Sequence, residues 1–158
     1  MMTYILRSPR NNHIVILSIL AFLAMCMGPA KKEVAPPNQT IIAALIEVES
    51  GGRDSAIGDK GKAVGCLQIH PGMIDEVNRI SKAKKTGKVF NLSDRTNRAK
   101  SVEIFIIYTN YYTPTWEPET VARRWNGGPE GDKKRSTLPY WAKVRPIFER
   151  LTKESQTK

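Results

Sequence analysis

The stretch AALIEVESGG at residues 43–52 predicts a helix that ends at two glycines, directly after an acidic residue. On this helix Glu49 continues the apolar stripe formed by the residues three, four and seven positions earlier, whereas Glu47 faces water. A carboxyl group beside an apolar surface is harder to ionise, so its pKa rises and it can donate a proton near neutral pH. We therefore interpret Glu49 as a candidate catalytic acid; the alternative is a surface glutamate at a helix end.

Length, composition and charge limit the class of protein. The 158 residues, 41% of them hydrophobic, suit one domain with an apolar core. The formal net charge of +10, from 25 basic and 15 acidic residues, favours a polyanionic partner: nucleic acid, an anionic membrane surface or an anionic cell-wall polymer. Zinc spacings, heptads and aromatic-glycine sheet signatures are missing, so we expect no nucleic-acid partner. The sequence also has no metal-ligand spacing and suggests no cofactor.

The first 30 residues have the layout of an export signal. Arg7 and Arg10 precede an apolar run at residues 14–27, and no acidic residue occurs before Glu33. This pattern predicts a signal peptide or an N-terminal membrane anchor, and small residues at 28–30 offer a possible cleavage site. Either form places the domain outside the cytoplasm: periplasmic, secreted, or held at the membrane through residues 14–27 and facing the cell wall. Residues 31–39, with two adjacent prolines, read as a linker.

The rest of the chain predicts a mostly helical α+β domain over residues 40–151. Asn38 or Thr40 can cap the first helix, and a loop or small hairpin follows at 53–62 as a β-like or irregular insert. Further helices are expected at about 73–82, from a cap at residues 93–94 through 112, at 119–125, and from 137 through 151. Tyr111 shares a helix face with three other large residues and is expected in the core. Residues 152–158 read as a frayed polar tail.

Three short motifs resemble the signatures of the lysozyme-like superfamily. They are residues 49–51 (ESG), 65–69 (GCLQI) and 125–128 (WNGG), and in the soluble lytic transglycosylases the corresponding patterns are E-S-G, G-L-M-Q and A-Y-N-x-G. Residues 122–129 and 136–144 are similar to the C-terminal part of the invertebrate-type (destabilase) lysozymes. The resemblance covers residues 40–146. It implies a lysozyme-like fold and cleavage of the β-1,4 bond between N-acetylmuramic acid and N-acetylglucosamine in peptidoglycan. We expect the protein to be a monomer.

The resemblance also assigns roles to residues. Glu49 falls on the catalytic glutamate, which protonates the glycosidic oxygen. Gln68 and Asn126 fall on residues that line the sugar cleft, and Tyr140 falls near a tyrosine placed beside the catalytic carboxyl in many members. Trp125 stands where the transglycosylases have tyrosine; it can stack on a sugar, or it can pack in the core.

The second carboxylate decides the mechanism. A retaining glycosidase needs two carboxyl groups roughly 5–5.5 Å apart, and an inverting one roughly 6.5–9.5 Å apart. Asp59 resembles the aspartate that invertebrate-type lysozymes place between their first two motifs, although an ordinary turn residue is the alternative, and Asp54 is a weaker candidate. Without a second carboxylate, the lytic transglycosylase route forms 1,6-anhydromuramyl ends, with Glu49 as acid and then base. A non-catalytic cell-wall-binding domain is the alternative from another class.

Two remaining side chains have alternative interpretations. His70 directly follows the second motif and is expected to be structural or exposed rather than catalytic. Cys66 is expected to be a buried, inert thiol. Some phage endolysins resemble this layout, with an anchor cysteine that exchanges with one near the active site, which would pair Cys26 with Cys66; the alternative is coincidence.

Overall fold

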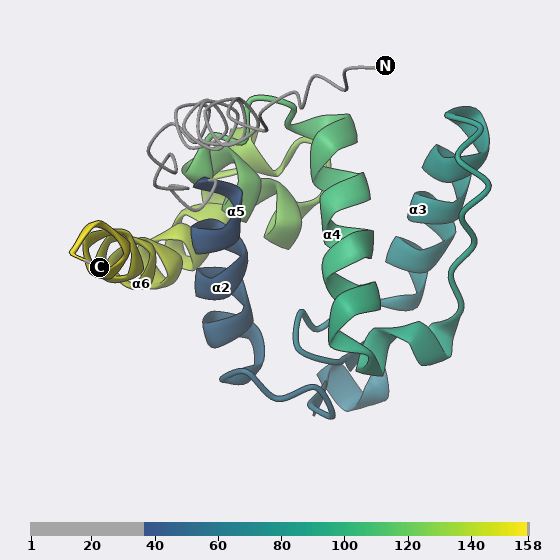
Figure 1. Cartoon of the computed structure of the whole chain (residues 1–158), viewed down its shortest axis with the longest axis horizontal. Helices are drawn as coiled ribbons and strands as arrows, with labels where there is room; N and C mark the ends of the chain where they lie inside the picture. The colour runs from purple at the N-terminus through teal and green to yellow at the C-terminus, as the bar shows by residue number, and fades with distance from the viewer. Residues whose placement is uncertain (1–36, 158) are drawn as a thin grey trace, which may run out of the picture. The chain divides into compact units, whose positions relative to one another are not determined.

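The computed structural model describes residues 37–157, and five α-helices account for most of them (Figure 1). The helices are α2 (Pro37–Ser50), α3 (Pro71–Ala83), α4 (Arg98–Tyr112), α5 (Pro118–Gly127) and α6 (Leu138–Gln156). Short 3₁₀ turns lie between them: η1 (Asp59–Gly61), η2 (Leu92–Thr96), η3 (Gly131–Lys133) and η4 (Arg135–Thr137). The prediction of a mostly helical domain with a small β insert is confirmed.

The predicted signal or anchor, the apolar run at 14–27 and Cys26 lie outside the described residues. Between residues 37 and 157, no helix is both long enough and apolar enough to cross a membrane. The last three residues of the predicted linker, 37–39, belong to α2.

A small hairpin follows α2, which is one of the two forms predicted for this segment. Its strands, β1 (Ile57–Gly58) and β2 (Ala63–Val64), pair antiparallel, with residue 57 opposite 64 and 58 opposite 63. The guanidinium of Arg95 stabilises the hairpin by donating hydrogen bonds to the carbonyl oxygens of Lys62 at 3.0 Å and Ile69 at 3.1 Å. Gly65 has a φ of +86° and lies so close to η2 that an added Cβ would overlap the carbonyl oxygen of Arg95. Only glycine fits that position without strain.

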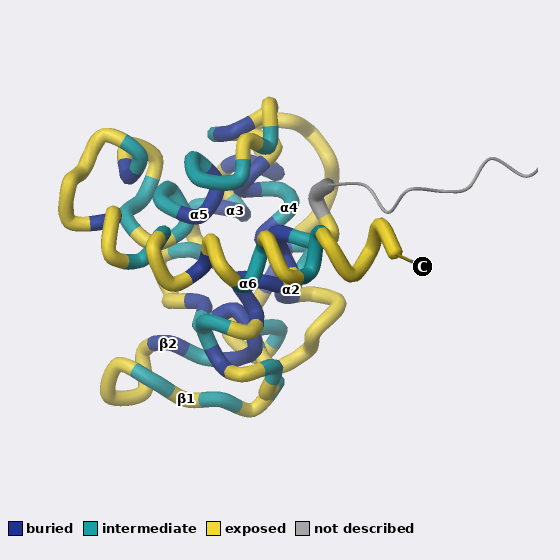
Figure 2. Tube along the Cα trace, turned by 90° about the vertical axis from the view of Figure 1, so that its left-hand side faces the viewer, coloured by how far each residue is buried: buried dark blue, intermediate teal, exposed yellow. Residues whose placement is uncertain are grey.

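The core forms around α2, which packs against α5 and α6, while α3 packs against α4. Ile41, Ala44 and Leu45 of α2 are fully buried, and so are Ile104 and Phe105 of α4. Exposed residues gather on the outer side of the hairpin and along α6 (Figure 2). The apolar stripe predicted for the first helix therefore does face the core, and it carries Glu49 at its end.

Several predicted boundaries and one burial prediction were wrong. The first helix begins at Pro37, before either predicted cap. Residues 93–94 lie in η2, and α4 begins at Arg98 with Asn97 as its cap, whose side chain accepts from the Lys100 amide at 3.1 Å. The last helix continues to Gln156, through most of the predicted frayed tail. Tyr111 is 39% exposed instead of lying in the core, because it borders an open hollow between the end of α3 and α4.

We expect Gly65→Ala to lower the free energy of unfolding by about 2 kcal/mol or more, because the methyl group meets backbone and φ is positive. Chemical denaturation measures this. Gly72→Ala is the matched control: Gly72 lies in the first turn of α3 with open space around the added Cβ, so alanine should be neutral or stabilising. Equal stability of the two variants would contradict the close packing described for Gly65.

Candidate active site

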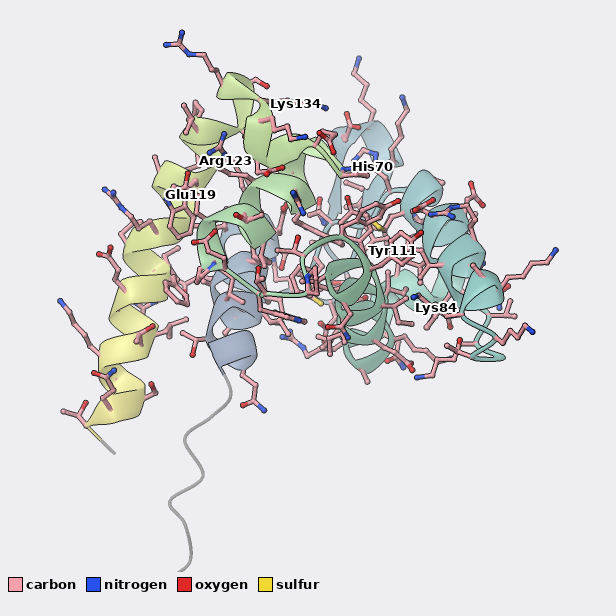
Figure 3. The ribbon with its side chains drawn as sticks, turned by 90° about the horizontal axis from the view of Figure 1, so that it is seen from above. His70, Lys84, Tyr111, Glu119, Arg123 and Lys134 are labelled. Atoms are coloured by element: carbon pink, nitrogen blue, oxygen red, sulfur yellow. The ribbon has the colours of Figure 1, made fainter. Side chains whose placement is uncertain are left out.

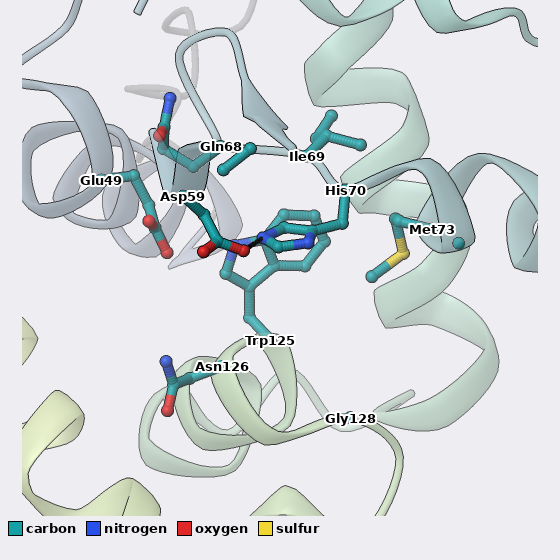
Figure 4. A pocket seen from close by; sticks show the side chains of 11 residues that line it. Glu49, Asp59, Gln68, Ile69, His70, Met73, Trp125, Asn126 and Gly128 are labelled. Atoms are coloured by element: carbon teal, nitrogen blue, oxygen red, sulfur yellow. Dashed lines mark ion pairs between the residues drawn. The ribbon is translucent and has the colours of Figure 1, made fainter. Parts of the chain in front are cut away.

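A cleft of about 580 Å³ brings together residues that are far apart in the sequence (Figure 4). Glu49 at the end of α2, Asp59 and Gln68 around the hairpin, and Trp125 and Asn126 on α5 all line it. Tyr140, the sixth residue predicted for the site, reaches Glu49 from α6. The structure thus places all six candidates at or beside one cleft.

The local structure after Glu49 explains the first motif. The Ser50 hydroxyl lies 2.9 Å from the carbonyl oxygen of Cys66 and 3.1 Å from that of Ile46, within donating distance of both, and it accepts from the Arg53 amide at 3.1 Å. Gly51 and Gly52 follow with φ angles of +59° and +83°, which favour glycine. Ser50 therefore joins the end of the helix to the second motif and sets the direction in which Glu49 points.

Glu49 has the electrostatic environment of a proton donor. Burial raises its pKa, which is opposed by hydrogen bonding to its carboxylate, first from Tyr140 and then from Trp125; burial prevails. The Tyr140 hydroxyl donates to Oε1 at 2.6 Å. The neighbouring acid differs: Glu47 is exposed and accepts two hydrogen bonds from Arg150, at 2.8 and 2.9 Å.

Trp125 belongs both to the cleft and to the aromatic core. Its ring packs edge-on against Phe105 and Tyr108, with centroids 4.9 and 5.9 Å apart, while the residue also lines the cleft. The preceding Arg124 binds Asp132 through two hydrogen bonds, at 2.8 and 3.0 Å. This ion pair ties α5 to the following turn, and so holds the exposed Asn126 at the opposite wall from the hairpin (Figure 4).

Gln68 supports the hairpin. Its side-chain amide donates to the carbonyl oxygens of Ala56 at 3.2 Å and Gly65 at 2.9 Å. The Gln68 amide oxygen lies so close to Gly58 that a Cβ there would overlap it. The backbone of Gln68 is left-handed, with φ of 48°, a strained conformation of the kind found at binding sites. Gln68 therefore borders the cleft and also fixes the turn that carries Asp59.

Asp59 projects into the cleft from the hairpin turn, and its carboxylate faces the same space as that of Glu49 (Figure 4). Its φ is also left-handed, at 46°, and its side chain is 57% exposed. The Nε2 atom of His70 lies 3.6 Å from its Oδ2 atom. Asp54, the weaker candidate, is instead paired with Arg98, with its Oδ1 atom 2.9 Å from the guanidinium, and does not line the cleft.

The sequence did not predict that His70 lines the cleft. It was expected to be structural or exposed, and it is exposed, but it also lines the cleft beside Asp59. The available signal was its position directly after the second motif. Cys66 is buried and forms no disulfide within residues 37–157, and burial raises the pKa of its thiol, in agreement with an inert side chain.

Removing the Tyr140 hydroxyl should raise the pKa of Glu49 further, because the charged form loses a hydrogen-bond donor. NMR titration of the Glu49 carboxyl in Tyr140→Phe measures this. Since a raised carboxyl pKa makes the folded state bind protons more readily, the variant should also lose more stability than the wild type as pH rises through that range.

Tyr112→Phe is the matched control for this titration. The Tyr112 hydroxyl donates to Glu76, whose pKa is held low mainly by Arg79 and also by Tyr112. Its removal should raise the pKa of Glu76 and leave that of Glu49 unchanged. A Glu49 pKa that is the same in the wild type and in Tyr140→Phe would contradict the role given to Tyr140.

Neither a scan against protein-family models nor searches of curated proteins and solved structures found a match for this chain. The residues of the cleft themselves indicate which chemistry it can carry out. They place a largely buried carboxyl with a raised pKa, Glu49, across one open cleft from an exposed carboxylate, Asp59.

Proposed function

We propose that this protein is a lysozyme-like glycosidase that cleaves the β-1,4 bond between N-acetylmuramic acid and N-acetylglucosamine in peptidoglycan. One observation carries the proposal: the carboxyl of Glu49 has a raised pKa and borders an open cleft that it shares with a second carboxylate. Two carboxyl groups in different environments are the arrangement that glycoside hydrolysis requires. The resemblance of the three motifs to the lysozyme-like superfamily supports the same substrate.

Glu49 acts as the general acid. Its raised pKa keeps it protonated closer to neutral pH, so that it can protonate the glycosidic oxygen as the bond breaks. The Tyr140 hydroxyl then donates to the carboxylate that remains, at the 2.6 Å distance already present in the free protein. Trp125 and Asn126, on the opposite wall, contact the sugar by stacking and by hydrogen bonding.

Asp59 acts as the second carboxylate. It is exposed and free to approach the anomeric carbon or a water molecule, which gives either a retaining or an inverting hydrolase. The imidazole of His70 lies beside it, with Nε2 3.6 Å from Oδ2 of Asp59. Gln68 keeps the turn that carries Asp59 in place.

A lytic transglycosylase is the second candidate within this class. The observation that favours it is the exposure of Asp59, whose side chain is 57% exposed at the edge of the hairpin and lies next to His70 instead of being enclosed with Glu49. In that reaction a hydroxyl of the substrate attacks, and Glu49 serves as acid and then as base. The product is a 1,6-anhydromuramyl end.

The remaining proposals concern partner and location. The net charge of +10 holds the protein electrostatically on an anionic cell wall. An export signal or anchor in the first 30 residues places a monomeric enzyme outside the cytoplasm, where peptidoglycan is found.

We expect Glu49→Gln to reduce lysis of peptidoglycan at least about 100-fold, because the amide cannot donate the required proton. Zymography on purified walls measures this. Glu47→Gln is the matched control: it lies two residues away on the same helix, is exposed and pairs with Arg150, so the variant should lyse walls normally. Full lysis by Glu49→Gln would contradict an enzyme built on this residue, and wall binding without lysis by the wild type would indicate a non-catalytic wall-binding domain.

If the protein is a hydrolase, Asp59→Asn should slow glycan cleavage by about 10²-fold or more, and the wild type should release reducing ends. Mass spectrometry of the soluble products distinguishes these from anhydro ends. Asp75→Asn, which changes an exposed aspartate of α3 outside the cleft, is the control. Anhydro ends from the wild type together with an active Asp59→Asn would favour the transglycosylase instead.

A further inference from the structure

A second hollow, of about 350 Å³, opens between the end of α3 and the last two turns of α4. It is separate from the cleft. Met73 borders the cleft at the first turn of α3, and Lys84, which follows the last turn, borders the hollow, so about 16 Å of helix lies between them. Figure 3 labels Lys84 and Tyr111 near one another, below His70 in that view.

The walls of the hollow are aliphatic and aromatic. Ile80 and Ile107 line it together with Tyr111, whose side chain was predicted in the core and is 39% exposed. The ammonium group of Lys84 lies 5.7 Å from the centre of the Tyr111 ring. An exposed ring with a cation at its face and aliphatic neighbours can hold an apolar group next to an anion.

Ser81 gives the hollow an unused polar group. The residue lines the hollow and is 1% exposed, and its hydroxyl has no hydrogen-bond partner among the described residues. A buried hydroxyl without a partner costs free energy, and such groups are rare in native proteins. A ligand atom that accepts a hydrogen bond from Ser81 would remove this cost.

The other polar groups at the hollow favour a ligand that accepts hydrogen bonds. Lys84 contributes an ammonium group. The side-chain oxygen of Asn110 already accepts from the Trp116 indole at 2.7 Å, which leaves its amide hydrogens for a ligand. Among the described residues that line the hollow, none is acidic.

The acidic residue that is linked to the Tyr111 ring through Arg79 does not offset that preference. Arg79 lies 5.5 Å from the Tyr111 ring centre and binds Glu76 through two hydrogen bonds, at 2.7 and 2.8 Å. The charge of Glu76 is therefore already compensated, and Lys84 remains available to an anion.

We propose that this hollow is a second binding site, which takes a carboxylate carried on a small aliphatic group. The carboxylate binds the ammonium of Lys84 and accepts a hydrogen bond from the Ser81 hydroxyl, while Ile80, Ile107 and the ring of Tyr111 enclose the aliphatic part. The site does not depend on Glu49, so it extends the proposed function without resting on it. A peptide that ends in alanine, such as a peptidoglycan stem, and a free carboxylic acid are the two sources of this chemistry.

NMR titration of the full-length protein with N-acetyl-D-alanyl-D-alanine tests the site. We expect saturable shifts centred on the backbone amides of Ser81, Asn110 and Tyr111, and none there with the same dipeptide carrying a C-terminal carboxamide. Tighter binding of the dipeptide than of propionate assigns the site to peptide ends, and equal binding assigns it to free acids; both support a carboxylate site. Equal shifts from the carboxamide, or shifts only around the cleft, would overturn the proposal.

Lys84→Gln should weaken binding of the dipeptide at least about tenfold, because a charge-assisted hydrogen bond is lost. Lys143→Gln is the matched control, since Lys143 is an exposed lysine on α6, far from the hollow in sequence, and its replacement should leave the affinity unchanged. An equal loss in both variants would indicate attraction by overall charge and would overturn the site.

Ser81→Ala gives a readout independent of charge. In the free protein it removes a buried hydroxyl without a partner, so the melting temperature should rise by roughly 2–5 °C. The same variant should bind the dipeptide more weakly than the wild type. A lower melting temperature would mean that the hydroxyl is already satisfied. The Glu49→Gln variant keeps this hollow intact. Loss of peptidoglycan lysis in that variant and loss of dipeptide binding in the Lys84→Gln or Ser81→Ala variant are therefore separate outcomes.

Discussion

The hydroxyl of Ser50 lies within hydrogen-bonding distance of the carbonyl oxygen of Cys66, and through this contact the first helix holds the segment that follows the hairpin. Glu49 directly precedes Ser50, and Gln68 follows Cys66 by two positions. The contact therefore fixes the positions of both Glu49 and Gln68. Gln68 then holds the hairpin through Ala56 and Gly65. The position of Asp59 depends on that hairpin, so the placement of both acidic residues of the cleft, Glu49 and Asp59, depends on one junction.

Helix packing gives the two carboxylates different surroundings. The apolar stripe of α2 is buried against the core, which draws Glu49 out of water and raises its pKa. Asp59 is carried on a two-stranded hairpin that is too small to bury its own turn, and its side chain remains 57% exposed. In the proposed reaction this unequal solvation lets Glu49 serve as the acid, while Asp59 remains accessible to the substrate.

Some of the strained and unsatisfied positions lie where ligands are proposed to bind. The left-handed backbones of Asp59 and Gln68 lie at the cleft, and the unpaired hydroxyl of Ser81 lies at the second hollow. The exposed ring of Tyr111 belongs to the same hollow. Departures from local packing rules are expected at binding sites, because a site must present to a ligand the groups that a core would satisfy internally. The same α3 helix contributes to the cleft at one end and to the hollow at the other.

The sequence predicted the helices, apart from some of their ends, a small insert after the first helix and the outward or inward direction of Glu47 and Glu49, because these depend on periodicity and glycine positions among neighbouring residues. Motif resemblance then selected the six candidate residues that the structure brings together. The sequence could not place His70 beside Asp59, expose Tyr111, or leave Ser81 without a partner. Only the tertiary structure decided these features, because they arise where separate helices and the hairpin meet. The hydrogen bond from Tyr140 to Glu49 shows the reason most directly: it joins residues 91 positions apart, a distance over which no local pattern carries information.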